Sequence, residues 1–298
     1  MKNFIIKFGN LDRRIIFLLI GLSVLIPLLN PNLIDLPLGQ DKNTKVVYDS
    51  ISSLNEGDKV LVSFAYGAST KPEVHPMAVA LLNHLFSKGI KVYIVSLWPE
   101  SPIMAQQAIS SVKKSELFNI QDGVDFVMFD YKVGGFVVIK GIADNFRDLY
   151  KQDSNGNSIE DLPIMNGVYS VKDFDFVFDF SAGVPGNAEW VQYACDPKNI
   201  PLSSGCTSIM VTDAIPYVES GQLRGILAGM PGAAEYEKMV YDYMIIEQEN
   251  NNLNINTKML ITKGKAYARM SAQSVAHLLM VIFIIIGNLS YYYSRKES

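Results

Sequence analysis

The sequence has little cysteine and little histidine, and it has no excess of basic residues. Only 2 of its 298 residues are cysteine and 3 are histidine, and the cysteines do not stand at the spacing of a zinc-ligand pair. A zinc site is therefore not expected. With 26 basic and 30 acidic residues the formal charge is −4, which argues against a basic nucleic-acid-binding protein. We predict no metal, no cofactor and no nucleic-acid partner.

Charged residues are missing altogether from two apolar stretches, one near each end of the chain. Ile15 to Ile34 spans 20 residues and Met270 to Tyr293 spans 24, and neither contains Asp, Glu, Lys or Arg. Each is long enough to cross a bilayer as a helix. This argues against a soluble enzyme and against a multi-span carrier. The predicted organisation is a cytoplasmic tail 1–14, a transmembrane helix 15–34, an α/β domain 35–269, a transmembrane helix 270–293 and a cytoplasmic tail 294–298.

The charges next to these stretches predict the orientation in the membrane. Basic residues precede the first stretch (Lys2, Lys7, Arg13 and Arg14) and follow the second (Arg295 and Lys296). The positive-inside rule places both termini in the cytoplasm, so the domain, with a charge of −8, is expected outside it. A cleaved signal peptide is the alternative for the first stretch. No A-x-A-like cleavage site follows it, which favours a retained anchor.

Polar residues interrupt the second apolar stretch. Gln273, Ser274 and His277 lie at helical spacing near its outer end, and Asn288 lies near its inner end. One interpretation is a packing face against the first stretch or another protein. The other is that these groups are solvated at the headgroups. Besides the lipid bilayer, the expected partner is a membrane protein or a second copy of this chain.

The two cysteines leave two interpretations open. Cys195 and Cys206 stand 11 residues apart, with two prolines and a glycine between them, so a disulfide closing a small loop is feasible in an oxidising compartment. Two unpaired buried thiols fit the same sequence. The cysteines alone do not decide the compartment.

The middle of the chain alternates short apolar runs with helical patterns. A leading helix is expected over Thr44 to Asn55, and Gly89 is expected to end the helix that follows the first run. The alternation predicts one doubly wound α/β domain with a mostly parallel sheet of about six strands, Rossmann-like or flavodoxin-like. Six runs rich in β-branched or aromatic residues are the predicted strands: Lys59 to Tyr66, Ile90 to Leu97, Asp125 to Tyr131, Phe174 to Phe180, Thr207 to Thr212 and Arg224 to Ala228. Polar segments at Lys151 to Ser158 and Glu249 to Thr257 are predicted to be a loop and a linker.

Two loops of this domain match each other. Ala182 to Trp190 and Ala228 to Tyr236 agree at six of nine positions, in the pattern A-G-φ-P-G-x-A-E-aromatic. We expect a strand to end at Gly183 or Gly229 and a helix to begin near Gly186 or Gly232. Backbone N–H groups there are candidates for binding a polar ligand. Neither loop fits the G-x-G-x-x-G or P-loop pattern, so neither predicts a nucleotide site.

The glutamate in each matched loop allows two interpretations. Glu189 and Glu235 fall in the first turn of the expected helices, where a carboxylate caps its own helix. Alternatively, the two flank one crevice together with Trp190 and Tyr236, which suits a polar partner. If the chain is an enzyme, the candidate catalytic residues are Glu189, Glu235, Asp213 and His75.

Two function classes follow. The first is a membrane-anchored binding or assembly subunit, favoured because no set of nucleophile, acid and base stands out. The second is an envelope-facing hydrolase or transferase that uses carboxylates at the strand ends.

Overall fold

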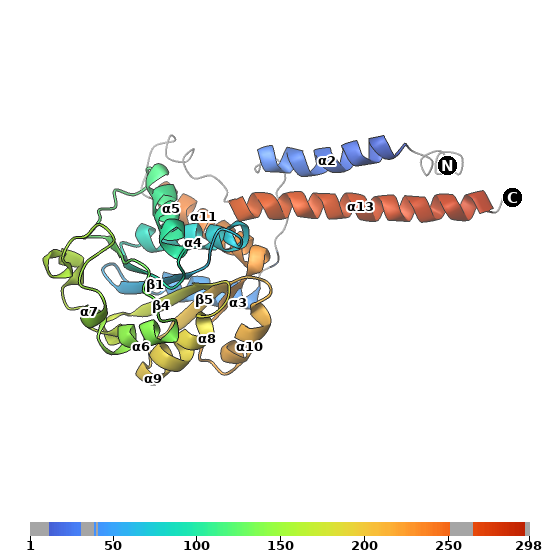
Figure 1. The fold of residues 1–298 in the computed structure, drawn as a ribbon. Coiled ribbons are helices and arrows are strands. Elements are labelled where there is room, and N and C mark those ends of the chain that lie inside the picture. Colours follow the sequence, from blue (N-terminus) through green and yellow to red (C-terminus); the bar gives the residue numbers. More distant parts are fainter. Residues whose placement is uncertain (1–11, 31–38, 40, 251–264, 296–298) are drawn as a thin grey trace. The chain divides into compact units, whose positions relative to one another are not determined.

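A computed structural model describes residues 12–30, 39, 41–250 and 265–295 of the chain (Figure 1). The chain divides into two compact units. One is Leu38–Ala266, and the other combines Met1–Pro37 with Tyr267–Ser298. Most of the predicted linker Glu249 to Thr257 and the last residues of the first apolar stretch lie outside the described residues.

The larger unit contains a sheet of six strands that all run parallel. Their order is β3-β2-β1-β4-β5-β6, so the chain moves outward from β1 to β3 and then crosses back to β4 beside β1. The strands are β1 (Lys59–Ala65), β2 (Lys91–Ser96), β3 (Phe126–Met128), β4 (Phe176–Ser181), β5 (Leu202–Cys206) and β6 (Ile226–Ala228). The predicted α/β class and a parallel sheet of six strands are confirmed.

Helices cover both faces of this sheet, as Figure 1 shows. Helices α4, α5 and α11 lie on one face, and α6, α8, α9 and α10 lie on the other. The helical elements of the unit are α3 (Lys42–Ser52), α4 (Lys71–Ser87), α5 (Ser101–Lys114), α6 (Phe136–Asp144), α7 (Phe146–Leu149), α8 (Asn187–Trp190), a π-helix (Val191–Cys195), α9 (Asp196–Lys198), α10 (Val211–Glu219) and α11 (Gly229–Asn250), with short 3-10 turns at Ile159–Asp161, Pro163–Met165 and Val171–Asp173.

Several local predictions agree with this structure. Helix α3 covers most of the expected leading helix and buries Val47 and Ile51. Helix α4 ends at Ser87, and Gly89 has φ +68°, the left-handed conformation that glycine supplies after a helix. The segment 151–158 is a polar turn in which Asp153 accepts the backbone N–H groups of Asn155 and Asn157.

The position of the fifth strand was predicted wrongly. The expected run Thr207 to Thr212 is a turn followed by the start of α10, and the strand is Leu202–Cys206. Its sequence, LSSGC, contains no β-branched residue, and its small residues pack closely in the sheet interior. A side chain at Gly205 would meet Phe180 and the Met77 sulfur at about 3 Å. Cys206 therefore stands at the carboxyl end of a strand, not at its start.

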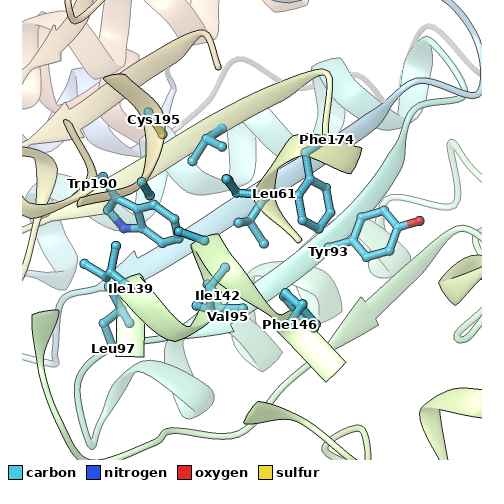
Figure 2. Packing of buried hydrophobic residues seen from close by; sticks show 14 of the residues in the cluster. Leu61, Tyr93, Val95, Leu97, Ile139, Ile142, Phe146, Phe174, Trp190 and Cys195 are labelled. Carbon is cyan, nitrogen blue, oxygen red and sulfur yellow. The ribbon is translucent and has the colours of Figure 1, made fainter. Parts of the chain in front are cut away.

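The hydrophobic core on the α6 and α8 face is one continuous cluster. Figure 2 shows Leu61 and Val95 of the sheet in this cluster, together with Trp190 and Cys195 from the segment after β4. All four are essentially inaccessible to solvent. Burial of this size is the main stabilising contribution to a domain of this length.

One described helix is long and apolar enough to cross a membrane. Helix α13 spans Lys265–Arg295, and within its 28-residue stretch Ala266–Tyr293 an 18-residue window has a mean hydropathy of 2.0. Helix α2 spans Arg13–Leu29. Its 17 residues extend about 26 Å, less than the roughly 30 Å hydrocarbon core of a bilayer. The structure thus supports one apolar C-terminal helix consistent with membrane association.

Candidate functional site

The strand order identifies the part of the sheet where a ligand site is expected. Strands β1 and β4 are neighbours, and the chain leaves them in opposite directions across the sheet. In parallel α/β sheets, ligands bind beyond the carboxyl ends of strands at such a switch point. The loops concerned are 66–70 after β1 and 182–186 after β4.

Glutamates hold the loops at this edge of the sheet. Each accepts the backbone N–H of a loop residue: Glu73 from Ser208 (2.8 Å), Glu100 from Ala68 (2.6 Å), Glu189 from Gly186 of its own segment (2.8 Å) and Glu235 from Asp41 (3.0 Å). A phosphate ligand needs free N–H groups of this kind. At these four positions the protein's own carboxylates already occupy them.

The two matched loops adopt different local structures. In the first, β4 ends at Ser181, Gly186 precedes α8, and Glu189 accepts the Gly186 N–H, as a capping carboxylate does. In the second, α11 begins directly at Gly229, so Gly232 lies inside the helix and no separate loop forms. Burial, the largest cause, raises the pKa of Glu235, and its N–H partner comes from the segment before α3.

The aromatic residues of the matched loops lie on opposite faces of the sheet. The Trp190 Nε1 donates to the Ser63 hydroxyl at 3.0 Å in the α8-side cluster. The Tyr236 hydroxyl pairs with His84 Nδ1 of α4 at 2.9 Å on the other face. Glu189 and Glu235 therefore do not form one crevice together with Trp190 and Tyr236. The sequence match suggested a shared site because it carries no information on which face each helix covers.

A row of polar side chains crosses the centre of the sheet beneath Trp190. In the strand register, Asp179 of β4 is paired with Ser63 of β1 on one side and with Ser204 of β5 on the other. Ser181 lies two residues beyond Asp179 and shares its face of the sheet. These four side chains are all essentially inaccessible to solvent.

Asp179 is the most unusual titratable group of the described residues. It is fully buried, and among the described residues neither carboxyl oxygen has a hydrogen-bond partner. Burial raises the pKa of Asp179 to about 7, and the charge of Glu189 acts in the same direction. Ser63, Ser181 and Trp190 lie near enough to lower it, without meeting hydrogen-bond geometry to the carboxyl.

Sequence reasoning missed Asp179, although a signal was present. The residue interrupts the run FDFVFDF, which predicts a strand whose alternate positions face two environments. A strand at the centre of a sheet with both faces covered has no solvent face. An Asp there is buried, which the predicted doubly wound fold already implied.

The other predicted catalytic residues do not gather at one point. His75 Nδ1 lies 2.9 Å from the Tyr66 hydroxyl, on the α4 face. Asp213 is exposed in the first turn of α10. Cys195 and Cys206 are buried free thiols with no bond between them. Burial, the largest cause, raises the pKa of both, that of Cys206 to about 12, so both are protonated at neutral pH.

The polar residues of the second apolar stretch all lie within α13. Gln273, His277 and Asn288 are exposed and Ser274 is half-buried.

Exposed apolar side chains mark the loops at the carboxyl edge. The three most exposed large hydrophobic residues of the described domain are Val133 (87%), Ile209 (87%) and Val184 (76%). Each follows a strand: β3, β5 and β4, respectively. Phe136 and Val137 lie at the start of α6, after β3, and are about half exposed. We call the five residues the apolar rim.

No protein-family model matches the chain, and no curated protein matches it. Among the described residues, no group of three or more His, Cys, Asp or Glu side chains is arranged to hold a metal ion.

Proposed function

We propose that this protein is a membrane-anchored binding or assembly subunit whose α/β domain contacts a partner through the apolar rim. The observation that carries the proposal is the position of the three most exposed hydrophobic side chains, on loops that follow three parallel strands. Exposed apolar side chains that gather on one surface are typical of interaction sites. The partner class is a membrane protein or a second copy of this chain.

The chemistry of the site supports binding over catalysis. Glutamates already occupy loop N–H groups that would stabilise an anionic ligand or intermediate. The two thiols are protonated and buried, which makes them poor nucleophiles. The strand order 3-2-1-4-5-6 is that of the Rossmann architecture and supports a Rossmann-like assignment, but the fold alone implies no reaction.

The anchor is proposed to consist of two spans, 15–34 and 270–293, with both termini cytoplasmic and the domain outside the cytoplasm. The apolar helix Ala266–Tyr293 supports the second span, and the basic residues at the chain ends support the orientation. Protease added to sealed vesicles of each orientation tests this at the polar turn 151–158. Cleavage only from the cytoplasmic side would contradict the proposal.

Site-specific crosslinking tests the binding surface. A photoreactive amino acid is placed at Val133, Val184 or Ile209 of the full-length protein in its own membranes, and crosslinked products are identified. Matched controls are Val124 and Tyr169, which are exposed apolar residues (39% and 59%) preceding β3 and β4, at the amino edge of the sheet. We expect crosslinks from the rim and not from the controls. Equal labelling at both edges would refute the assignment of the surface.

An envelope-facing hydrolase or transferase is the second candidate, and the pKa of Asp179, near 7, is the observation that favours it. A carboxyl group with that pKa can accept or donate a proton at neutral pH. If the protein is an enzyme of this kind, Asp179→Asn abolishes its function in the cell without changing the crosslinks from the rim. If it is a binding subunit, Ile209→Asp and Val184→Asp abolish both.

A further inference from the structure

We propose that Asp179, Ser63, Ser181 and Ser204 form an internal binding site for a monovalent metal cation of the sodium or potassium class. The argument starts from the position of these residues. Asp179 is paired in register with Ser63 and Ser204 on the two neighbouring strands, which lie about 4.8 Å away on either side. Ser181 lies on the same face, one step nearer the carboxyl edge. Ser63 and Ser204 thus flank the Asp179 carboxyl group on its two sides and Ser181 lies beyond it, so three hydroxyl groups surround one carboxyl group on this face of the sheet.

The second observation is that four oxygen atoms of this set lack a hydrogen-bond partner. Both carboxyl oxygens of Asp179 and the hydroxyl oxygens of Ser181 and Ser204 have no hydrogen-bond partner among the described residues. Buried polar groups without a partner call for an explanation, such as a bound water molecule or ion. The Ser63 hydroxyl accepts the Trp190 Nε1–H, which leaves an oxygen lone pair available.

Charge and ligand chemistry identify the class of ligand. Sodium and potassium are hard cations, which bind oxygen ligands such as carboxylates and hydroxyls. The site contains one buried carboxylate, so a cation of charge +1 neutralises it, whereas a divalent ion leaves an unbalanced charge in the core. Glu189 is the nearby second carboxylate, but it is half-buried and bonded to the Gly186 N–H.

Trp190 covers the proposed site, and the backbone that follows it has an unusual helical turn. Trp190, which is fully buried above Ser63, is followed directly by a π-helical turn, Val191–Cys195. Single π-helical turns are rare and occur often at functional sites. The loop before Trp190 is equally constrained, because a side chain at Gly186 would meet the Gly183 carbonyl and Ser181 within 2.7 Å.

Thermal unfolding of the full-length protein in detergent micelles tests the proposal. Trp98 and Trp190 are the only tryptophans, and both lie in the α/β domain, so their fluorescence reports its unfolding. The midpoint is measured at pH 8 in NaCl, KCl or choline chloride at equal ionic strength. A cation present at about tenfold over its Kd raises Tm by roughly 3–6 °C relative to choline.

Variants separate this site from a general salt effect. Asp179→Asn removes the charge at nearly constant shape, and we expect it to abolish the difference between sodium or potassium and choline. Ser204→Ala should reduce the difference. Ser203→Ala is the matched control, because Ser203 is the adjacent fully buried serine of β5 but is paired with Phe178 and faces the opposite side of the sheet.

Three results would overturn the proposal. The first is an equal Tm in all three salts, which would leave bound water as the compensation for these oxygens. The second is a cation response that persists in Asp179→Asn. The third is an equal loss of response in Ser203→Ala and Ser204→Ala, since only one of these hydroxyls lies on the face of Asp179.

Discussion

The two faces of the sheet differ in how a buried titratable group is hydrogen-bonded. On the α4 face, His84 is buried with Tyr236 at one ring nitrogen and the Ser52 hydroxyl 3.3 Å from the other, and Tyr48 stacks on its ring. On the α8 face, Asp179 has no hydrogen-bond partner among the described residues. Both groups lie beside an aromatic residue of the same nine-residue motif. The same motif therefore adopts a different local structure on each face, and its partners across the sheet determine its chemistry.

The largest expected effect tests whether the two motif aromatics contribute equally to stability. Trp190→Ala and Tyr236→Ala each remove a large, fully buried side chain. We expect each to lower the free energy of unfolding by about 3–5 kcal/mol. Chemical denaturation of the full-length protein in micelles, followed by far-UV circular dichroism, provides the measurement. A loss below about 1 kcal/mol for either variant would show that its face is not closely packed.

The pH dependence of stability gives the sharpest contrast between the faces. Burial raises the pKa of Asp179 from 3.8 to about 7, so the folded state holds this proton more tightly than the unfolded state. Its contribution to the free energy of unfolding therefore decreases as pH rises from about 4 to about 7, by about 4 kcal/mol in total. Burial, with a smaller effect of Lys88, lowers the pKa of His84 from 6.5 to about 3. Its contribution is lost as pH falls from 6.5 towards 3.

The pH dependences of these two contributions oppose each other between about pH 4 and 6.5. The free energy of unfolding of the wild type should therefore change little in this range. In choline chloride, Asp179→Asn should lose stability on acidification through this range, because only the His84 contribution remains. Other titratable groups that interact with Asp179 are Glu189, Cys195 and Cys206, and both thiols stay protonated throughout. Identical pH profiles for Asp179→Asn and the wild type would contradict the assigned pKa.

A smaller effect is expected from removing one hydrogen bond on the α4 face, where His84 has hydrogen-bond partners. Tyr236→Phe leaves His84 Nδ1 buried without that partner and should cost about 1–3 kcal/mol. Tyr241→Phe, at a half-buried position of the same helix, is the control and should stay within about 0.5 kcal/mol. Equal losses in the two variants would mean that the Tyr236–His84 bond is not specifically stabilising. The readout is again the denaturation midpoint.

The smallest effect concerns the two motif glutamates. Glu189→Gln keeps an acceptor for the Gly186 N–H but loses the charge near the start of α8, so a cost of about 0.3–1 kcal/mol is expected. Glu235 is half-buried and its pKa is raised by burial, so Glu235→Gln should be neutral or slightly stabilising. The denaturation midpoints of the two variants, measured at pH 8, check this prediction. A larger loss of stability in Glu235→Gln than in Glu189→Gln would contradict this prediction.

Much of the fold could be predicted because it depends on patterns local to the chain. Apolar runs such as Lys59–Ala65 and helical spacing such as that of α4 are visible in the sequence, and their alternation requires a covered parallel sheet. The position of the fifth strand was predicted wrongly because LSSGC has a weak local β propensity and is stabilised by its neighbours β4 and β6.

The candidate site was predictable only in part. The first matched loop indicated where α8 begins and that Glu189 would bond its own helix, as it does. The second gave the wrong start, because α11 begins at Gly229 and not near Gly232. Neither loop indicated that Trp190 and Tyr236 would lie on opposite faces, or that Glu235 would receive the N–H of Asp41, 194 residues away along the chain.

From the sequence alone follow the α/β class, the acidic character of the domain and the apolar C-terminal helix, because composition and periodicity are properties of contiguous residues. Only the tertiary structure decided that Asp179 lies between Ser63 and Ser204 and that Val133, Val184 and Ile209 share one edge. Strand order and register bring distant residues together, and no local pattern records them.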